Sequence, residues 1–233
     1  MILNLETSAE VCSVALSHQG VLIGIREQVQ GMKSGTLLTV FIEELLQEHH
    51  LRVQDLDAVA VSRGPGSYTG LRIGVSAAKG LCYGAGIPLI AISTLEALTE
   101  GYVSTLTPEL SSGVICPLID ARRMEVYTAV YDFSGVLCAP ARARIVGPGS
   151  FDEWLSRGPV HFIGNAVTKC RDALAHPNAV FCDRVMHSAR NLPRLSHEAF
   201  QQQRFEDIAY FEPFYLKDFM PTQPKASVIH KTH

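Results

Sequence analysis

The chain has 233 residues, of which 47% are hydrophobic and 18% are charged. These values are typical of globular proteins and exclude a disordered chain, a fibre and a coiled coil. Its 20 Lys and Arg residues against 23 Asp and Glu residues give a net charge of −3. No stretch gathers one sign densely enough to indicate a chain that binds nucleic acid or lipid by itself.

The sequence predicts neither export nor membrane insertion. The first basic residue is Arg26, and the apolar run at 2–5 is too short for a secretory signal. The longest uncharged run, 80–95, is shorter than a membrane span and contains glycine and proline. Six cysteines without a Cys-x-x-Cys pair indicate buried, reduced thiols. We therefore expect a cytoplasmic protein with no membrane partner.

The first half of the chain predicts three strands followed by alternating helices and strands. Short apolar or alternating runs between turn residues indicate strands, and apolar residues at helical spacing indicate helices. The predicted strands are 2–6, 11–16, 21–29, 57–61 and 87–92, and the predicted helices are 36–49, 70–83 and 94–102.

The same order begins again after a turn-rich segment at 107–113. The predicted strands are 114–120, 125–131, 135–139, 160–163 and 179–182, and the predicted helices are 150–156, 166–175 and 193–203. The repeated order β-β-β-α-β-α-β-α predicts an α/β protein with two similar lobes, residues 1–106 and 107–216. We expect residues 217–233 to form a flexible tail.

Two ribonuclease-H-like halves in tandem make the actin-like ATPase (ASKHA) fold of actin, Hsp70 and the sugar kinases. In that architecture, the acids that end the first strand of each half face a nucleotide across a cleft. Here these acids are Glu6 and Asp120. Arg122 and Arg123 follow Asp120 and suit carboxylate or phosphate recognition at the cleft or at a partner surface, although a solvated hairpin tip would look the same.

A glycine-rich segment at 62–80 lies between a predicted strand and a predicted helix, where anions often bind. It contains no Gly-Lys-Ser/Thr, and its glycine spacing does not fit the dinucleotide fingerprint. Instead, Gly66, Gly70 and Gly74 recur every four residues and lead into Ala77 and Ala78. Such a small-residue helix face permits close packing, either within the chain's own core or against another subunit.

The motif GPGSYTGLRIG at 64–74 closely resembles the TsaB (YeaZ) family. Further matches in the same order are Glu6-Thr7-Ser8 and the segments 78–81, 86–89, 93–98, 120–127 and 213–216. The resemblance covers residues 1–130 well and the remainder loosely.

The resemblance implies a non-catalytic subunit that works with the related TsaD subunit and the small ATPase TsaE. The complex makes the threonylcarbamoyl modification of adenosine 37 in tRNAs that read codons starting with A. It uses ATP, whereas the chain itself is expected to bind no cofactor stably and to meet tRNA only through the complex.

TsaB proteins pair through their first two helices, with TsaD or, when alone, as a homodimer. Carried onto this chain, the expected interface is Leu38, Phe41, Ile42, Leu45, Gly66, Gly70, Gly74, Ala77 and Ala78. A larger side chain at Gly74 is expected to block pairing while the lone chain stays folded.

The residues offer little for catalysis. The nine histidines include no His-x-x-x-His pair, and no Gly-x-Ser-x-Gly elbow is present. We therefore expect no metal site, no catalytic residues and no enzyme activity. The alternative is a nucleotide-dependent ATPase or kinase of the actin-like superfamily, for which Glu6 and Asp120 would be the candidate acids.

Overall fold

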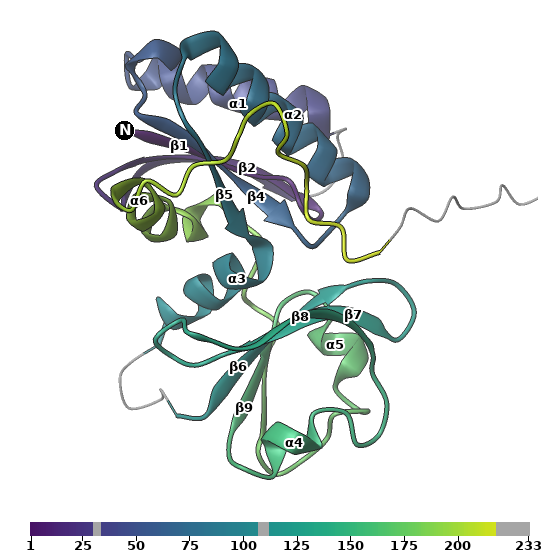
Figure 1. Ribbon diagram of the computed structural model, residues 1–233. Helices are drawn as coiled ribbons and strands as arrows, with labels where there is room; N and C mark the ends of the chain where they lie inside the picture. The colour runs from purple at the N-terminus through teal and green to yellow at the C-terminus, as the bar shows by residue number, and fades with distance from the viewer. Residues whose placement is uncertain (30–33, 107–111, 218–233) are drawn as a thin grey trace, which may run out of the picture.

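The computed structural model describes residues 1–29, 34–106 and 112–217, and it contains two lobes that each hold a five-stranded mixed sheet (Figure 1). The predicted lobe boundary at 106/107 falls at the edge of the described residues. Residues 218–233 of the predicted tail lie outside the described residues. No helix in the described ranges is long and apolar enough to cross a bilayer.

The first sheet has the strand order β3-β2-β1-β4-β5. Its strand β1 is antiparallel to β2, with Leu3 opposite Leu16, and parallel to β4, with Leu3 opposite Val59. The strands are β1 (Ile2–Glu6), β2 (Val11–His18), β3 (Val21–Val29), β4 (Ala58–Gly64) and β5 (Leu89–Ser93).

The second sheet repeats this arrangement with the order β8-β7-β6-β9-β10. Strand β6 is antiparallel to β7 and parallel to β9, as β1 is to β2 and β4. The strands are β6 (Val114–Asp120), β7 (Glu125–Tyr131), β8 (Leu137–Ile145), β9 (Val160–Ile163) and β10 (Ala179–Cys182). Equal order and direction in both sheets confirm the predicted actin-like fold of two ribonuclease-H-like lobes.

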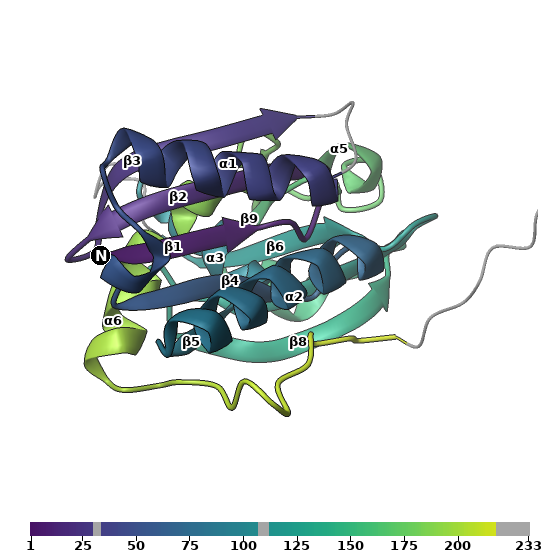
Figure 2. The same ribbon diagram turned by 90° about the horizontal axis from the view of Figure 1, so that it is seen from above.

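Helices α1 (Ser34–Glu48) and α2 (Tyr68–Ala85) lie side by side on one face of the first sheet (Figure 2). Both bury an apolar stripe against alternate residues of the strands, because side chains on a strand point to one face every second position. The hydroxyl of Ser67 caps α2 by accepting from the Gly70 N–H at 3.3 Å. Gly86, at a φ of 68°, ends the helix in the left-handed conformation.

The remaining α-helices lie between the two sheets or on the outer face of the second sheet. Helix α3 (Thr94–Val103) packs against the second sheet, and α4 (Asp152–Leu155) and α5 (Val167–Cys170) cover that sheet's outer face. The short helices η1 (Val53–Asp55) and η3 (Ala189–Asn191) precede β4 and α6 (Pro193–Gln201) in the chain. Helix α6 covers the face of the first sheet opposite α1 and α2.

The structure corrects three expectations for the second half. The chain from η3 through α6, assigned from sequence to the second lobe, packs on the first sheet, where Leu195 joins Ile2 and Ile90 in one cluster. Strand β8 runs on to Ile145, although Pro140 interrupts its pattern, because it is an edge strand that tolerates a missing donor. Helices α4 and α5 are each only four residues long.

Candidate functional site: the groove between α1 and α2 and the strand-end acids

A groove of about 590 Å³ lies between the outward surfaces of α1 and α2. Glu43 and Arg52 contribute charge to its wall, but most of the lining is apolar. The apolar lining residues are Ile42, Leu46, Leu51, Val53, Ala77 and Leu81. Gly80 also lines the groove, and no atom lies within 4 Å of the position a Cβ would take there. The groove is therefore an apolar surface with room for a partner's side chains.

The predicted glycine face does not form part of this surface, because it packs inward against the loop that follows β1. A Cβ at Gly70 would lie 2.0 Å from the carbonyl oxygen of Thr7, and one at Gly74 would lie 2.3 Å from the Thr7 hydroxyl. A Cβ at Gly66 would lie 2.3 Å from the Ser8 carbonyl oxygen. These glycines let α2 approach β1, and a larger side chain at Gly74 would strain the fold of the lone chain itself, contrary to the sequence expectation.

Most of the other predicted interface residues also face inward. Leu38, Leu45 and Ala78 are at most 1% exposed and belong to the core between the first sheet and its two helices. Phe41 is half-buried against the same core. Residues with almost no accessible surface cannot contact a partner directly. Of the predicted set, Ile42 and Ala77 line the groove.

The carboxylate of Glu6 is buried at the end of β1 and is held by its own lobe. It is 1% exposed, and it accepts hydrogen bonds from the Ser8 N–H at 2.6 Å and from the Ser62 hydroxyl. His187 is buried near it, and burial lowers the pKa of its imidazole, an effect that Glu6 and Glu10 oppose.

The carboxylate of Asp120 is exposed at the end of β6 and is bound by groups of the second lobe. The ammonium of Lys169 forms an ion pair with it, and the Arg122 N–H donates to it at 2.7 Å. Within the described ranges, no hydrogen bond or ion pair joins Asp120 to Glu6. The structure thus places the two acids at corresponding strand ends, but each is bound by groups of its own lobe.

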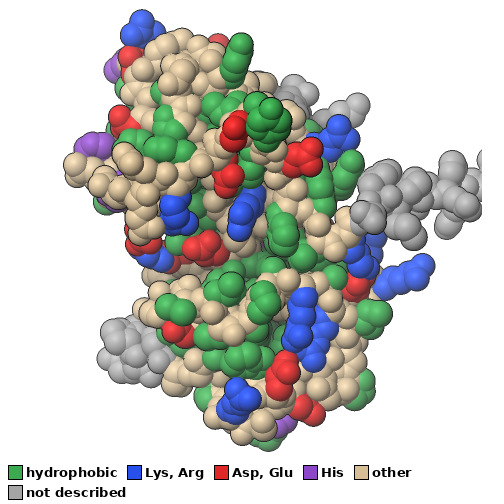
Figure 3. Space-filling model, in the orientation of Figure 1, with side chains coloured by type: hydrophobic (Ala, Val, Ile, Leu, Met, Phe, Trp, Pro, Cys, Tyr) green, Lys and Arg blue, Asp and Glu red, His purple; other side chains and the backbone are tan. Residues whose placement is uncertain are grey.

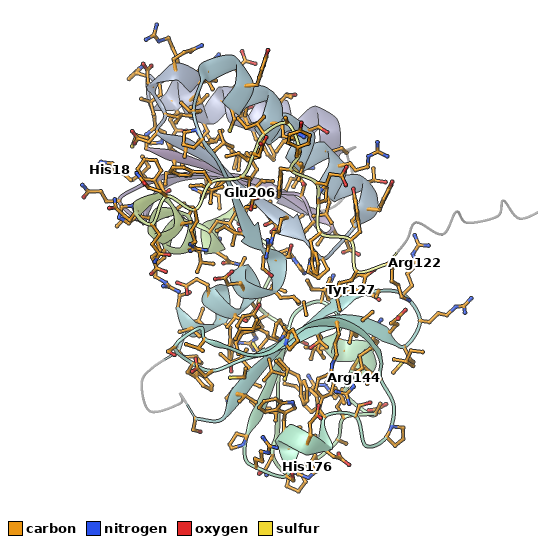
Figure 4. The ribbon with its side chains drawn as sticks, viewed as in Figure 1. His18, Arg122, Tyr127, Arg144, His176 and Glu206 are labelled. Carbon is orange, nitrogen blue, oxygen red and sulfur yellow. The ribbon has the colours of Figure 1, made fainter. Side chains whose placement is uncertain are left out.

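The turn that follows Asp120 carries Arg122 and Arg123 into solvent (Figure 4). Both lie on an exposed hairpin tip, a position that fits either of the two interpretations that the sequence left open. Neither residue lines the groove between α1 and α2.

The C-terminal strap, residues 205–217, is a feature that the sequence did not locate. It runs along β5 and α2, where the Lys79 ammonium donates to two of its carbonyl oxygens. The Phe214 N–H donates to the carbonyl of Arg63 at 2.7 Å, and Lys217 forms an ion pair with Glu125 of the second lobe. The only sequence signal was the Pro-Phe-Tyr-Leu match at 213–216, which gave no position in space.

The buried His187 is expected to make stability depend on pH. Because burial lowers its folded-state pKa, the unfolded chain binds a proton more readily, and stability is lost as pH falls below about 6.5, by up to about 1.4 kcal/mol per pH unit. We expect His187→Gln to flatten the decline of unfolding free energy between pH 7 and pH 5 in urea titrations. The same change at the exposed His18 is the matched control, and a slope in His187→Gln equal to that of the parent would contradict this assignment.

Two ribonuclease-H-like lobes, with an acid ending the first strand of each, define an actin-like protein. The sequence model of the TsaD family, described as tRNA N6-adenosine threonylcarbamoyltransferase, matches residues 28–225. The chain therefore belongs to this family, and its similarity within the family is to the TsaB (YeaZ) proteins, as the sequence motifs indicated.

Two bacterial relatives carry the name tRNA threonylcarbamoyladenosine biosynthesis protein TsaB. The Haemophilus influenzae protein is 37% identical over 153 residues, which cover 66% of this chain and 59% of the relative. The Escherichia coli protein is 27% identical over 223 residues, which cover 93% of this chain and 94% of the relative. The match thus spans less than two thirds of the first relative and nearly all of the second.

Two solved structures share the fold over almost their whole length. An uncharacterised Pseudomonas aeruginosa protein with similarity to peptidase YeaZ has a TM-score of 0.80 at 26% identity, covering 93% of this chain and 99% of that one. YeaZ from Pseudomonas aeruginosa has a TM-score of 0.76 at 25% identity, covering 92% and 99%.

Proposed function

We propose that this chain is a non-catalytic partner subunit of a TsaD–TsaB–TsaE complex. The complex attaches the threonylcarbamoyl group to adenosine 37 of tRNAs that read codons starting with A. The names of the Haemophilus influenzae and Escherichia coli relatives support a role in this pathway. The match to the TsaD family supports a related, TsaD-like subunit as the partner.

The state of the two strand-end acids carries the proposal that the chain is a pseudoenzyme. Phosphoryl transfer needs carboxylates that can hold a metal ion and its phosphates. Each carboxylate oxygen of Glu6 accepts a hydrogen bond, one from Ser8 and one from Ser62, in a buried position, and Asp120 is paired with Lys169. These contacts do not fit a metal–nucleotide complex, so ATP is used elsewhere in the assembly and the chain needs no cofactor of its own.

The groove between α1 and α2 is the docking surface for the TsaD-like subunit and, when the chain is alone, for a second copy of itself. An apolar groove lined by two adjacent helices suits a helical partner, because burying apolar surface drives such pairing. The TsaE-like ATPase joins the pair, tRNA is bound only by the assembled complex, and the assembly works in the cytoplasm.

Nucleotide turnover by the isolated chain separates this proposal from an ATPase or kinase. We expect ATP hydrolysis at the rate of a buffer control and no ATP binding in calorimetry. In the same preparation, the chain should co-purify with the TsaD-like subunit. Hydrolysis above the control that is abolished by Glu6→Gln together with Asp120→Asn would overturn the proposal and identify an enzyme.

A further inference from the structure

The turn between β6 and β7 holds two consecutive arginines in an unusual backbone conformation. Arg122 and Arg123 have φ values of 72° and 51°, in the left-handed region that glycine and asparagine adopt at lower cost. Neither side chain is needed for the turn itself, since a glycine would make it more easily. Both arginine side chains are exposed on this turn.

The acids beside this turn are paired with lysines, so the exposed surface of the turn is cationic. The Lys169 ammonium binds Asp120 and also donates to the carbonyl oxygens of Arg123 and Glu125, at 2.7 and 2.8 Å. Lys217 in turn pairs with the Glu125 carboxylate. Neither Arg122 nor Arg123 forms an ion pair with any residue that the structure describes. One lysine thus holds the turn through three contacts, one to a carboxylate and two to carbonyl oxygens. Both arginine side chains remain available to bind an external anion.

The shape of the turn favours a long polyanion over a small ligand. Arg122 points into solvent at the outer edge of the second lobe (Figure 4), and basic side chains gather along this edge of the molecule (Figure 3). A small anion needs enclosure by converging donors. A nucleic-acid backbone, in contrast, can pass a convex cationic tip and bring several of its phosphates close to the arginines.

We propose that the Arg122–Arg123 turn binds the phosphate backbone of tRNA in the assembled complex. This inference rests on the proposed function and adds to it a direct contact between this chain and the RNA. The net charge of −3 keeps the isolated chain from binding RNA by itself, so the turn supplements contacts made by the TsaD-like subunit. Backbone contacts of this kind add affinity without sequence preference.

The test uses the double variant Arg122→Gly/Arg123→Gly, because glycine keeps the left-handed backbone while removing both charges. The complex of the chain with its TsaD-like subunit is first isolated by size exclusion. An unmodified tRNA transcript that reads a codon starting with A is then titrated by fluorescence anisotropy at several salt concentrations. We expect about tenfold weaker binding near 0.15 M salt, and a salt dependence of log K shallower by about 1.5, the value for two lost phosphate contacts.

Matched variants separate a local contact from a general charge effect. Arg157→Ala/Arg184→Ala removes the same charge from two other exposed sites of the second lobe and should bind RNA as the parent does. Arg122→Lys/Arg123→Lys should retain most of the affinity.

Unchanged affinity and salt slope in the glycine variant, or an equal loss in the control, overturns the proposal. Weakened assembly with unchanged RNA affinity of the assembled complex also overturns it, since the turn would then bind an acidic protein surface. A complex that never forms refutes the proposed function instead, so the two failures are distinguishable.

Discussion

Replacing Gly70 by alanine is expected to destabilise the chain by about 3 kcal/mol or more, because the added methyl group has no space. Its carbon would lie 2.0 Å from the carbonyl oxygen of Thr7, a backbone atom that cannot rotate away. The Thr7 hydroxyl also donates to the carbonyl of Gly70 at 2.8 Å, so the helix cannot withdraw without losing this bond. Urea unfolding followed by circular dichroism measures the effect.

Gly80 provides the matched control in the same helix. It lies in the interior of α2, it is exposed, and no atom lies within 4 Å of a Cβ placed there. Gly80→Ala should therefore stabilise the chain by about 0.5–1 kcal/mol through helix propensity alone. If Gly70→Ala were as stable as the parent, α2 would not pack on the loop after β1 as described.

Replacing Gly80 by arginine is expected to abolish most pairing through the groove while the chain stays folded. The side chain would extend from the wall of a mostly apolar groove, and a docked partner would have to accommodate its bulk and bury its charge. That penalty of about 2 kcal/mol or more corresponds to a ~30-fold weaker affinity. Titration calorimetry with the TsaD-like subunit and sedimentation of the chain alone measure the two kinds of pairing.

Gly84→Arg is the control for this prediction. Gly84 also lies in α2 with no atom within 4 Å of a Cβ, but it does not line the groove. The variant should pair as the parent does. Equal pairing by Gly80→Arg, or an equal loss in Gly84→Arg, would show that the partner binds another surface.

The order of the elements could be predicted from sequence because each strand and helix carries its own periodicity. The alternating and apolar runs of β1 to β5 and of β6, β7, β9 and β10 lie close to their predicted ranges. Strand β8 was predicted too short since its alternation of small residues with Arg142 and Arg144 lacks an apolar face.

The packing partners could not be predicted, because periodicity shows that a face is buried but not against what. Gly66, Gly70 and Gly74 suit a partner helix as well as they suit the Thr7–Ser8 loop, which comes from a distant part of the sequence. The return of α6 to the first sheet and the path of the C-terminal strap depend on long-range contacts in the same way. The groove residues Leu51 and Val53 were missed because they follow the first predicted helix. Leu81 lies within the second predicted helix, but the interface there was assigned to its glycine and alanine face.

The central claim is that this chain supports tRNA modification without performing chemistry itself. It is tested most directly by reconstituting the reaction with the TsaD-like and TsaE-like subunits, tRNA, ATP and threonylcarbamoyl-adenylate. The product is measured by nucleoside mass spectrometry. We predict that modified adenosine forms only when the chain is present, and that Glu6→Gln/Asp120→Asn supports it as well as the parent while Gly80→Arg does not. Loss of product with the acid variant, in a chain that still folds and pairs, would contradict the account.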